Sequence, residues 1–125
     1  MNVIWVGACG VVGVLLRYSL GMAAERVVSM TLPVTTLAIN VLGSFLIGLV
    51  YVFGNEAATL SPELRVGLSV GLLGGFTTFS TYALELVRLA EAGQLWLAGL
   101  YFGLSTGLGM GAAFAGILLA RRLTS

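Results

Sequence analysis

Hydroxyl-bearing and aromatic side chains alternate within one apolar segment that is long enough to cross a bilayer. The stretch starts at the pair Gly74-Gly75 and reads Gly-Gly-Phe-Thr-Thr-Phe-Ser-Thr-Tyr-Ala-Leu-Glu as far as Glu85. Polar groups inside a membrane usually face the protein interior or a water-filled cavity rather than lipid. The stretch therefore indicates either a pathway for a solute or a tightly packed, hydrogen-bonded interior.

The aromatic residues of this stretch recur every three positions. In a continuous helix Phe76, Phe79 and Tyr82 would form one stripe. Such stripes usually pack in a core. However, the edge of an aromatic ring is partly positive, so a stripe can also stabilise a partly dehydrated small anion without binding it too tightly to leave.

The hydroxyl groups predict a second, polar face. Thr77, Thr81 and Glu85 are spaced by four residues and lead to a carboxylate, and Tyr101 and Ser105 share a face of a later segment that can extend this track. Two alternatives stay open. The hydroxyls can bond to carbonyls of the preceding turn, and Glu85 can be either a proton carrier or a solvated charge at a helix end.

Two further polar positions lie inside apolar segments. Asn40, flanked by Thr36 and Ser44 at four-residue spacing, can donate to an anion or join two helices by a hydrogen bond. Arg17 is the only charge in the first apolar segment before its end. It can line an entrance to a pathway or tie the helix end to the rest of the bundle.

The pair Gly74-Gly75 predicts a helix break at membrane depth. Backbone carbonyls freed there are tolerated only where they are buried in protein or face a cavity or an ion. Carbonyl oxygens suit a hard cation such as Na⁺. A dimer axis through this point would gather such oxygens from two copies.

The composition of the 125-residue chain is that of a membrane protein. Hydrophobic residues make up 58% and charged residues 9%, whereas soluble domains carry about a quarter charged residues. A net charge of +1 gives no sign of nucleic-acid binding. The sequence has no His, Lys or Asp and one cysteine. No enzyme and no thiolate metal cluster are predicted.

Four apolar segments predict an all-α protein in which a single domain, residues 1–125, crosses the membrane four times. The predicted spans are residues 3–24, 32–53, 64–89 and 95–119. Ser61-Pro62 predicts the start of the third span, Gly93 its end, and the glycine pair a break near its middle. In the fourth span a glycine stripe favours close approach of another helix; its members are Gly99, Gly103, Gly107 and Gly111.

The arginines give no clear orientation. Arg65, Arg121 and Arg122 belong to the side of the termini, whereas Arg26 and Arg88 belong to the other side. The positive-inside rule requires a bias that is nearly absent here. A protein that inserts both ways can pair with its inverted copy and so imitate the inverted repeats of larger transporters.

Over essentially its whole length the chain resembles the Fluc (CrcB) family of fluoride channels. The resemblance is carried by the glycine-rich first segment ending in Arg17-Tyr18, by Thr36 and Asn40 with Gly43, and above all by the motif that ends at Glu85. It implies a dual-topology, antiparallel homodimer in the bacterial inner membrane. Its two pores would let cytoplasmic fluoride leave by passive electrodiffusion and so reduce its toxicity.

The resemblance also implies roles for residues. Phe79 and Tyr82 match two phenylalanines whose ring edges face fluoride, so the tyrosine hydroxyl is a departure from the family pattern. Other residues are implied for the fluoride pathway: Asn40, Ser105, Thr36, Thr81, Tyr101 and the vestibule carboxylate Glu85. Gly74 and Thr77 match positions whose backbone carbonyls hold a structural Na⁺ at the dimer interface. Arg17 matches an arginine near the pore entrance.

Two other functions remain open at this stage. A proton-coupled small-molecule exporter of the small four-helix type also inserts both ways, but it needs an acid embedded in its first helix. Here that helix carries Arg17 and has no acid before Glu25. A purely structural subunit would use the glycine stripe for packing and the hydroxyls as interhelical hydrogen bonds.

Overall fold

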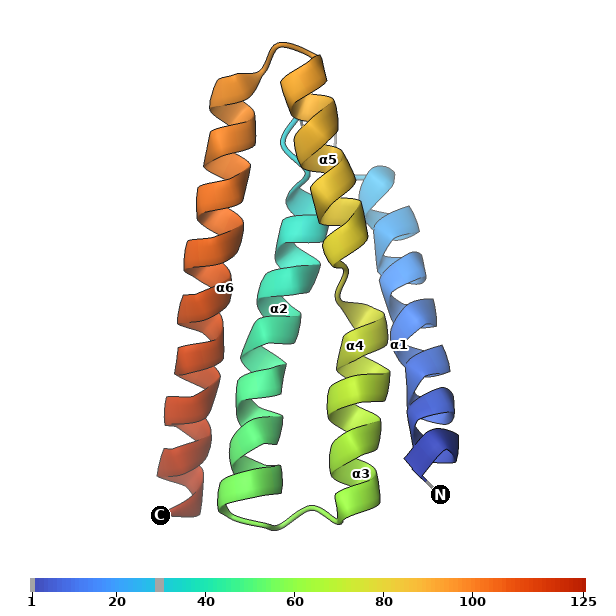
Figure 1. Ribbon diagram of the computed structural model, residues 1–125, viewed down its shortest axis with the longest axis vertical. Helices are drawn as coiled ribbons and strands as arrows, with labels where there is room; N and C mark the ends of the chain where they lie inside the picture. Colours follow the sequence, from blue (N-terminus) through green and yellow to red (C-terminus); the bar gives the residue numbers. More distant parts are fainter. Residues whose placement is uncertain (1, 29–30) are drawn as a thin grey trace.

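The computed structural model describes residues 2–28 and 31–125, and the described chain forms a bundle of long helices (Figure 1). Its elements are α1 (Asn2–Glu25), α2 (Val34–Tyr51), the π-helix η1 (Val52–Glu56), α3 (Pro62–Val66), the π-helix η2 (Gly67–Leu73), α4 (Gly74–Phe76), α5 (Phe79–Glu91) and α6 (Leu95–Thr124). Together they make four segments long and apolar enough to cross a membrane: Asn2–Glu25, Val34–Glu56, Pro62–Glu91 and Leu95–Thr124. The predicted all-α class and the four spans are confirmed, with differences of at most five residues at their ends.

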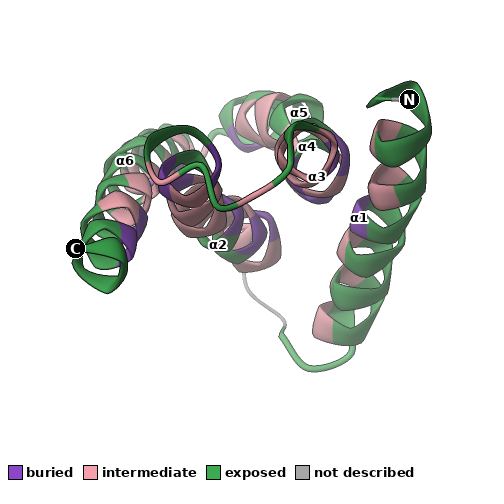
Figure 2. Ribbon diagram, turned by 90° about the horizontal axis from the view of Figure 1, so that it is seen from below, coloured by how far each residue is buried: buried purple, intermediate pink, exposed green. Residues whose placement is uncertain are grey.

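The second span occupies the middle of the bundle. In Figure 1, α2 lies between α6 on one side and the third span on the other, and α1 lies beyond the third span. Seen from below in Figure 2, the buried faces point inward and much of the outer surface of α1 and α6 is exposed. The chain therefore offers broad apolar faces to its surroundings, as a membrane protein must.

Glycines let two pairs of spans approach backbone to backbone. On α1, a Cβ added to Gly13 would overlap the carbonyl of Leu72 in the third span. Between α2 and α6, a Cβ on Gly48 would meet the carbonyl of Ala113, and one on Gly116 that of Phe45. Close packing of this kind is how helices associate where lipid is as apolar as their side chains.

The predicted glycine stripe of α6 does not make these contacts. Among the described residues, apart from chain neighbours and the backbone of α6 itself, no atom lies within 4 Å of a Cβ built on any member of the stripe. Within one chain α6 packs on α2 through other residues, including Ala113 and Gly116. A partner helix for the stripe, outside the single chain, stays a prediction.

The two predicted ends of the third span are confirmed. Ser61 is the N-cap of α3, and its Oγ accepts a hydrogen bond from the backbone N–H of Leu64 at 3.2 Å. At the other end Gly93 has a φ of +77°, and the N–H of Gln94 donates to the carbonyl of Leu89 at 2.9 Å. This geometry is a glycine-terminated helix end.

A bidentate ion pair joins the end of the second span to the end of the fourth. Arg121 donates from Nε to Oε2 of Glu56 at 2.9 Å and from Nη2 to Oε1 at 2.6 Å. Because both side chains are solvent-accessible, we expect Arg121→Gln to leave the melting temperature in detergent nearly unchanged. If Arg121→Gln lowered the melting temperature as much as replacing a packing glycine by alanine, this expectation would be contradicted.

Candidate functional site

The backbone of the third span leaves the helical conformation at two threonines. Thr77 has φ −84° and ψ 161°, and Thr78 has φ −148° and ψ 122°, so both are extended. Gly74, by contrast, is helical, with φ −62° and ψ −37°, and belongs to α4 together with Gly75. The prediction that the helix breaks at the glycine pair is therefore wrong by about one turn.

A side chain from another span accounts for the position of these extended residues. The N–H of Thr78 donates to Oδ1 of Asn40 at 2.9 Å rather than to the carbonyl four residues earlier. Gly75 serves a different purpose, because a Cβ there would lie 2.9 Å from the carbonyl oxygen of Gly10 in α1. Gly75 permits close packing against α1, and the hydrogen bond to α2 fixes the departure from helix.

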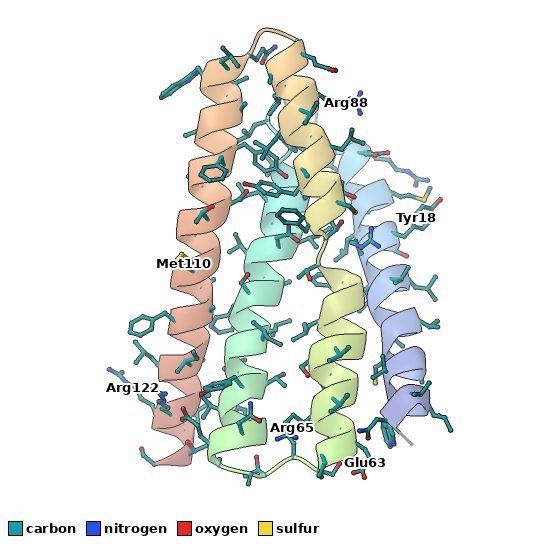
Figure 3. All side chains as sticks on the ribbon, viewed as in Figure 1. Tyr18, Glu63, Arg65, Arg88, Met110 and Arg122 are labelled. Carbon is teal, nitrogen blue, oxygen red and sulfur yellow. The ribbon has the colours of Figure 1, made fainter. Side chains whose placement is uncertain are left out.

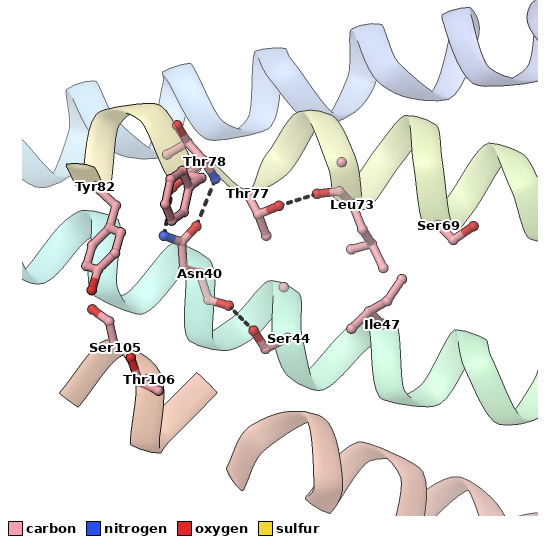
Figure 4. A pocket seen from close by; sticks show the side chains of 13 residues that line it. Asn40, Ser44, Ile47, Ser69, Leu73, Thr77, Thr78, Tyr82, Ser105 and Thr106 are labelled. Atoms are coloured by element: carbon pink, nitrogen blue, oxygen red, sulfur yellow. Dashed lines mark hydrogen bonds between the residues drawn. The ribbon is translucent and has the colours of Figure 1, made fainter. Parts of the chain in front are cut away.

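Asn40 is bonded to Thr78 in both directions (Figure 4). Its Nδ2 donates to the carbonyl of Thr78 at 3.0 Å while its Oδ1 accepts from the same residue's N–H. One turn later on α2, Ser44 donates to the carbonyl of Asn40 at 2.7 Å. Asn40 thus makes an interhelical hydrogen bond and, at the same time, lines a cavity.

This cavity, of about 490 Å³, lies between α2, the third span and α6. Its lining residues are Asn40, Gly43, Ser44, Ile47, Ser69, Leu73, Gly74, Thr77, Thr78, Phe79, Tyr82, Ser105 and Thr106. Within the described chain this lining contains no charged side chain. The Oγ of Ser105 is buried and has no hydrogen-bond partner among the described residues.

The aromatic residues at the cavity do not form the predicted three-residue stripe. Phe76 is 5% exposed, whereas Phe79 is 79% exposed, because the extended residues between them turn α5 relative to α4. The rings of Phe79 and Tyr82 are tilted by 59° with centroids 5.9 Å apart. Tyr82 in turn meets Tyr101 edge-on, at 5.1 Å and 75°.

A second cavity, of about 570 Å³, lies between α1, the start of α2 and α5. Predicted site residues in its lining are Arg17, Thr36, Thr81 and Glu85. Arg17 donates from Nε to the carbonyl of Gly75 at 3.1 Å. Thr78 lines both cavities, so the extended segment lies where the two cavities approach each other.

Tyr101 connects the predicted residues at the first cavity with those at the second cavity. It is fully buried, its ring touches Tyr82 at the first cavity, and its hydroxyl donates to Oε1 of Glu85 at 3.4 Å. The predicted track from Thr77 to Glu85 is divided, because Thr77 precedes α5 and lines only the first cavity.

Four residues that line the first cavity were not predicted from the sequence. They are Ile47, Ser69, Leu73 and Thr106. Ile47 is three residues after Ser44 and so lies near the same face of α2 as Asn40 and Ser44. Helical periodicity could therefore have predicted it. Ser69 lies in the π-helix η2, where that periodicity fails.

The donors available for a metal are backbone carbonyls. In residues 2–28 and 31–125 no group of three or more His, Cys, Asp or Glu side chains could hold a metal ion. Gly74 and Thr77, predicted to offer carbonyls, both line the first cavity. In a continuous helix the N–H of Thr78 would bond to the carbonyl of Gly74, but here it bonds to Asn40.

Comparison with known proteins gives the family. Residues 4–117 match the model of the family described as CrcB-like protein, Camphor Resistance (CrcB). The chain belongs to the CrcB family. A protein from Allorhizobium ampelinum, named fluoride-specific ion channel FluC, is 43% identical over 122 residues, 98% of each chain. Proteins of the same name from Acidobacterium capsulatum and Geotalea daltonii are 38% identical over 125 residues, all of each chain, and 45% identical over 97 residues, 78% of each chain.

Membership of this family agrees with the resemblance seen in the sequence. The CrcB match covers all four spans nearly from end to end. With its four apolar helices, the chain is a multi-pass membrane protein. The FluC relatives are ion channels by name, which places this family among channels rather than enzymes.

Proposed function

We propose that the chain is a fluoride-selective channel of the bacterial inner membrane, through which cytoplasmic fluoride leaves by passive electrodiffusion and its toxicity is reduced. The observation that carries this proposal is the uncharged cavity of a CrcB-family chain, where an amide, hydroxyls and aromatic rings meet. Weak donors from several groups suit conduction, because an ion must be able to leave each site. The names of the FluC relatives identify fluoride as the ion.

Several groups at the first cavity are free to replace water around a small anion. Asn40 uses one amide hydrogen for Thr78 and keeps the second. Ser105 has a hydroxyl with no protein partner in the described chain. The rings of Phe79 and Tyr82 add their positive edges.

The second cavity would form the outer part of the pathway. Arg17 brings one positive charge to a lining that also holds the hydroxyls of Thr36 and Thr81 and the carboxylates of Glu25 and Glu85. An anion that enters there meets the hydrogen-bonded pair Glu85–Tyr101 before it reaches the aromatic rings.

We further propose that two chains of opposite orientation form a homodimer with two pores. Phe79 lines the cavity yet is 79% exposed in a single chain, so the site is incomplete without a second copy that covers this ring. The even distribution of arginines permits insertion both ways. The third span acts as two helices joined by extended Thr77 and Thr78, and this junction lies against the second copy.

A structural Na⁺ at the junction fits the donors of the chain. The carbonyls of Gly74 and Thr77 are hard oxygen donors beside the first cavity. Two such oxygens are too few for one cation, so the second copy would supply the other pair. The ion would hold the two chains together electrostatically, with no part in selecting the anion.

Fluoride efflux from liposomes tests the proposed function. Purified protein is reconstituted alone, a K⁺ ionophore clamps the voltage, and fluoride and chloride are followed with selective electrodes. We expect rapid release of fluoride without release of chloride. Absence of fluoride release from well-folded protein would contradict the proposal.

The hydroxyl of Tyr82 is expected to be dispensable. Tyr82→Phe keeps the ring that meets Tyr101 edge-on and removes only the phenolic oxygen. Fluoride flux should therefore match or exceed that of the parent protein, with chloride still excluded. Loss of flux from a correctly folded Tyr82→Phe protein would show that the hydroxyl is required.

A further inference from the structure

One backbone N–H and one backbone carbonyl of the third span would form hydrogen bonds within a continuous helix. Side chains of two other spans bind them instead. A continuous helix would join the N–H of Thr78 to the carbonyl of Gly74, and the N–H of Phe79 to the carbonyl of Gly75. In the structure the N–H of Thr78 donates to Asn40, and the carbonyl of Gly75 accepts from Arg17. The carbonyl of Gly75 lies before the extended segment, and the N–H of Thr78 lies within it.

The bonds made by Asn40 suit extended backbone. A carboxamide that both donates to and accepts from one residue imitates the paired hydrogen bonds between neighbouring β-strands. Thr78, with φ −148° and ψ 122°, has the matching conformation. Its hydroxyl also accepts from the N–H of Thr81 at 3.3 Å, so the same residue caps α5.

The two side chains reach the segment because glycines let their helices approach the third span closely. A Cβ on Gly43, three residues after Asn40, would overlap the side chain of Thr77. On α1, a Cβ on Gly13 would overlap the backbone carbonyl of Leu72, and Arg17 follows one turn later on the same face. The distances are thus set by the packing of α1 and α2, and not by the third span itself.

We propose that Asn40 and Arg17 act as a two-point clamp that prevents the third span from closing into one continuous helix. Both are positioning residues for the rings of α5. Two extended residues cover about 3.3 Å each, against 1.5 Å each in a helix. Closure would shorten the span by about 3.6 Å and rotate Phe79 and Tyr82 away from the first cavity.

Loss of the clamp favours closure for a physical reason. Without Asn40, the N–H of Thr78 loses its partner at membrane depth, where an unpaired backbone group is costly. Helix closure provides a new partner within the span. Closure changes a distance within the third span, whether or not the protein conducts fluoride.

The test is a spin-label distance across the third span. Labels are placed at Ser61 and Glu91, which flank it and are exposed, in protein carrying Cys9→Ser and diluted with unlabelled protein in lipid nanodiscs. Asn40→Ala and Arg17→Met should each shift population to a distance shorter by about 3.6 Å, and the double variant should shift more. Ser44→Ala, which removes the neighbouring hydrogen bond on α2, should leave the distance unchanged.

A second label pair, at Gln94 and Thr124, separates closure from general loss of structure. It spans α6 and should not change in any variant. If Asn40→Ala does not fold, the isosteric Asn40→Asp, which retains the acceptor and loses the donor, should give a smaller shift of the same sign. An unchanged Ser61–Glu91 distance in folded Asn40 variants would overturn the clamp. Reduced fluoride flux at unchanged distance would assign Asn40 to direct contact with the ion alone.

Discussion

Replacement of Phe79 by isoleucine is expected to lower fluoride flux at least about tenfold, which corresponds to about 1.4 kcal/mol in the barrier. Isoleucine retains an apolar side chain on α5 but has no ring quadrupole. The ring edge that would offset the partial dehydration of the anion is thereby lost. Flux per folded protein in voltage-clamped liposomes measures the effect.

Phe114 provides the matched control. It is also a largely exposed phenylalanine, at 60%, but it is on α6 and is not among the residues that line the first cavity. Phe114→Ile should leave fluoride flux close to that of the parent protein. Equal flux from Phe79→Ile and Phe114→Ile would contradict the assignment of Phe79 to the pathway.

Gly13→Ala should destabilise the bundle by about 1–3 kcal/mol, the usual cost of forcing extra methyl groups into a packed contact. The added Cβ would overlap the carbonyl of Leu72 and approach the N–H of Phe76. Backbone atoms on both sides cannot move aside as a flexible side chain can. The helices α1 and α4 would have to separate next to the extended segment.

Thermal unfolding in detergent, followed by circular dichroism and size-exclusion chromatography, measures this loss. Gly7→Ala is the control on the same helix, because in the described chain no atom outside the adjoining residues and backbone of α1 lies within 4 Å of a Cβ built there. Similar melting temperatures for the two variants would show that α1 does not approach the third span as closely as described.

The spans and the lining residues of the site were largely predictable. Hydropathy and helix-end signals are local, so Ser61 and Gly93 could be placed from their neighbours alone. Of the predicted fluoride-pathway residues, all but Tyr101 line one of the two cavities. Whether each of them contacts fluoride stays a prediction.

The position of the extended segment could not be read from local sequence. It depends on a hydrogen bond between Asn40 and Thr78, which are 38 residues apart in the chain. Glycine lowers helix propensity, but it does not by itself end a helix. The aromatic stripe failed for the same reason, since Phe76 and Phe79 fall on opposite sides of that segment.

Local sequence also could not show which glycines pack against a neighbouring helix. The regular spacing in α6 made its stripe the most visible signal, yet the contacts within the chain use Gly13, Gly48 and Gly116. Spacing shows which glycines share a face, and it does not show which face meets a neighbouring helix.

The reversal potential of the current carried by the reconstituted protein distinguishes a passive fluoride channel from a coupled exporter. Under a tenfold fluoride gradient, with chloride and pH equal on both sides, a passive fluoride channel reverses at about 59 mV, the value for a single charge. That potential should not move when a pH gradient is imposed or when chloride is changed on one side. A reversal potential that follows the proton gradient would instead indicate a proton-coupled exporter and contradict passive fluoride conduction.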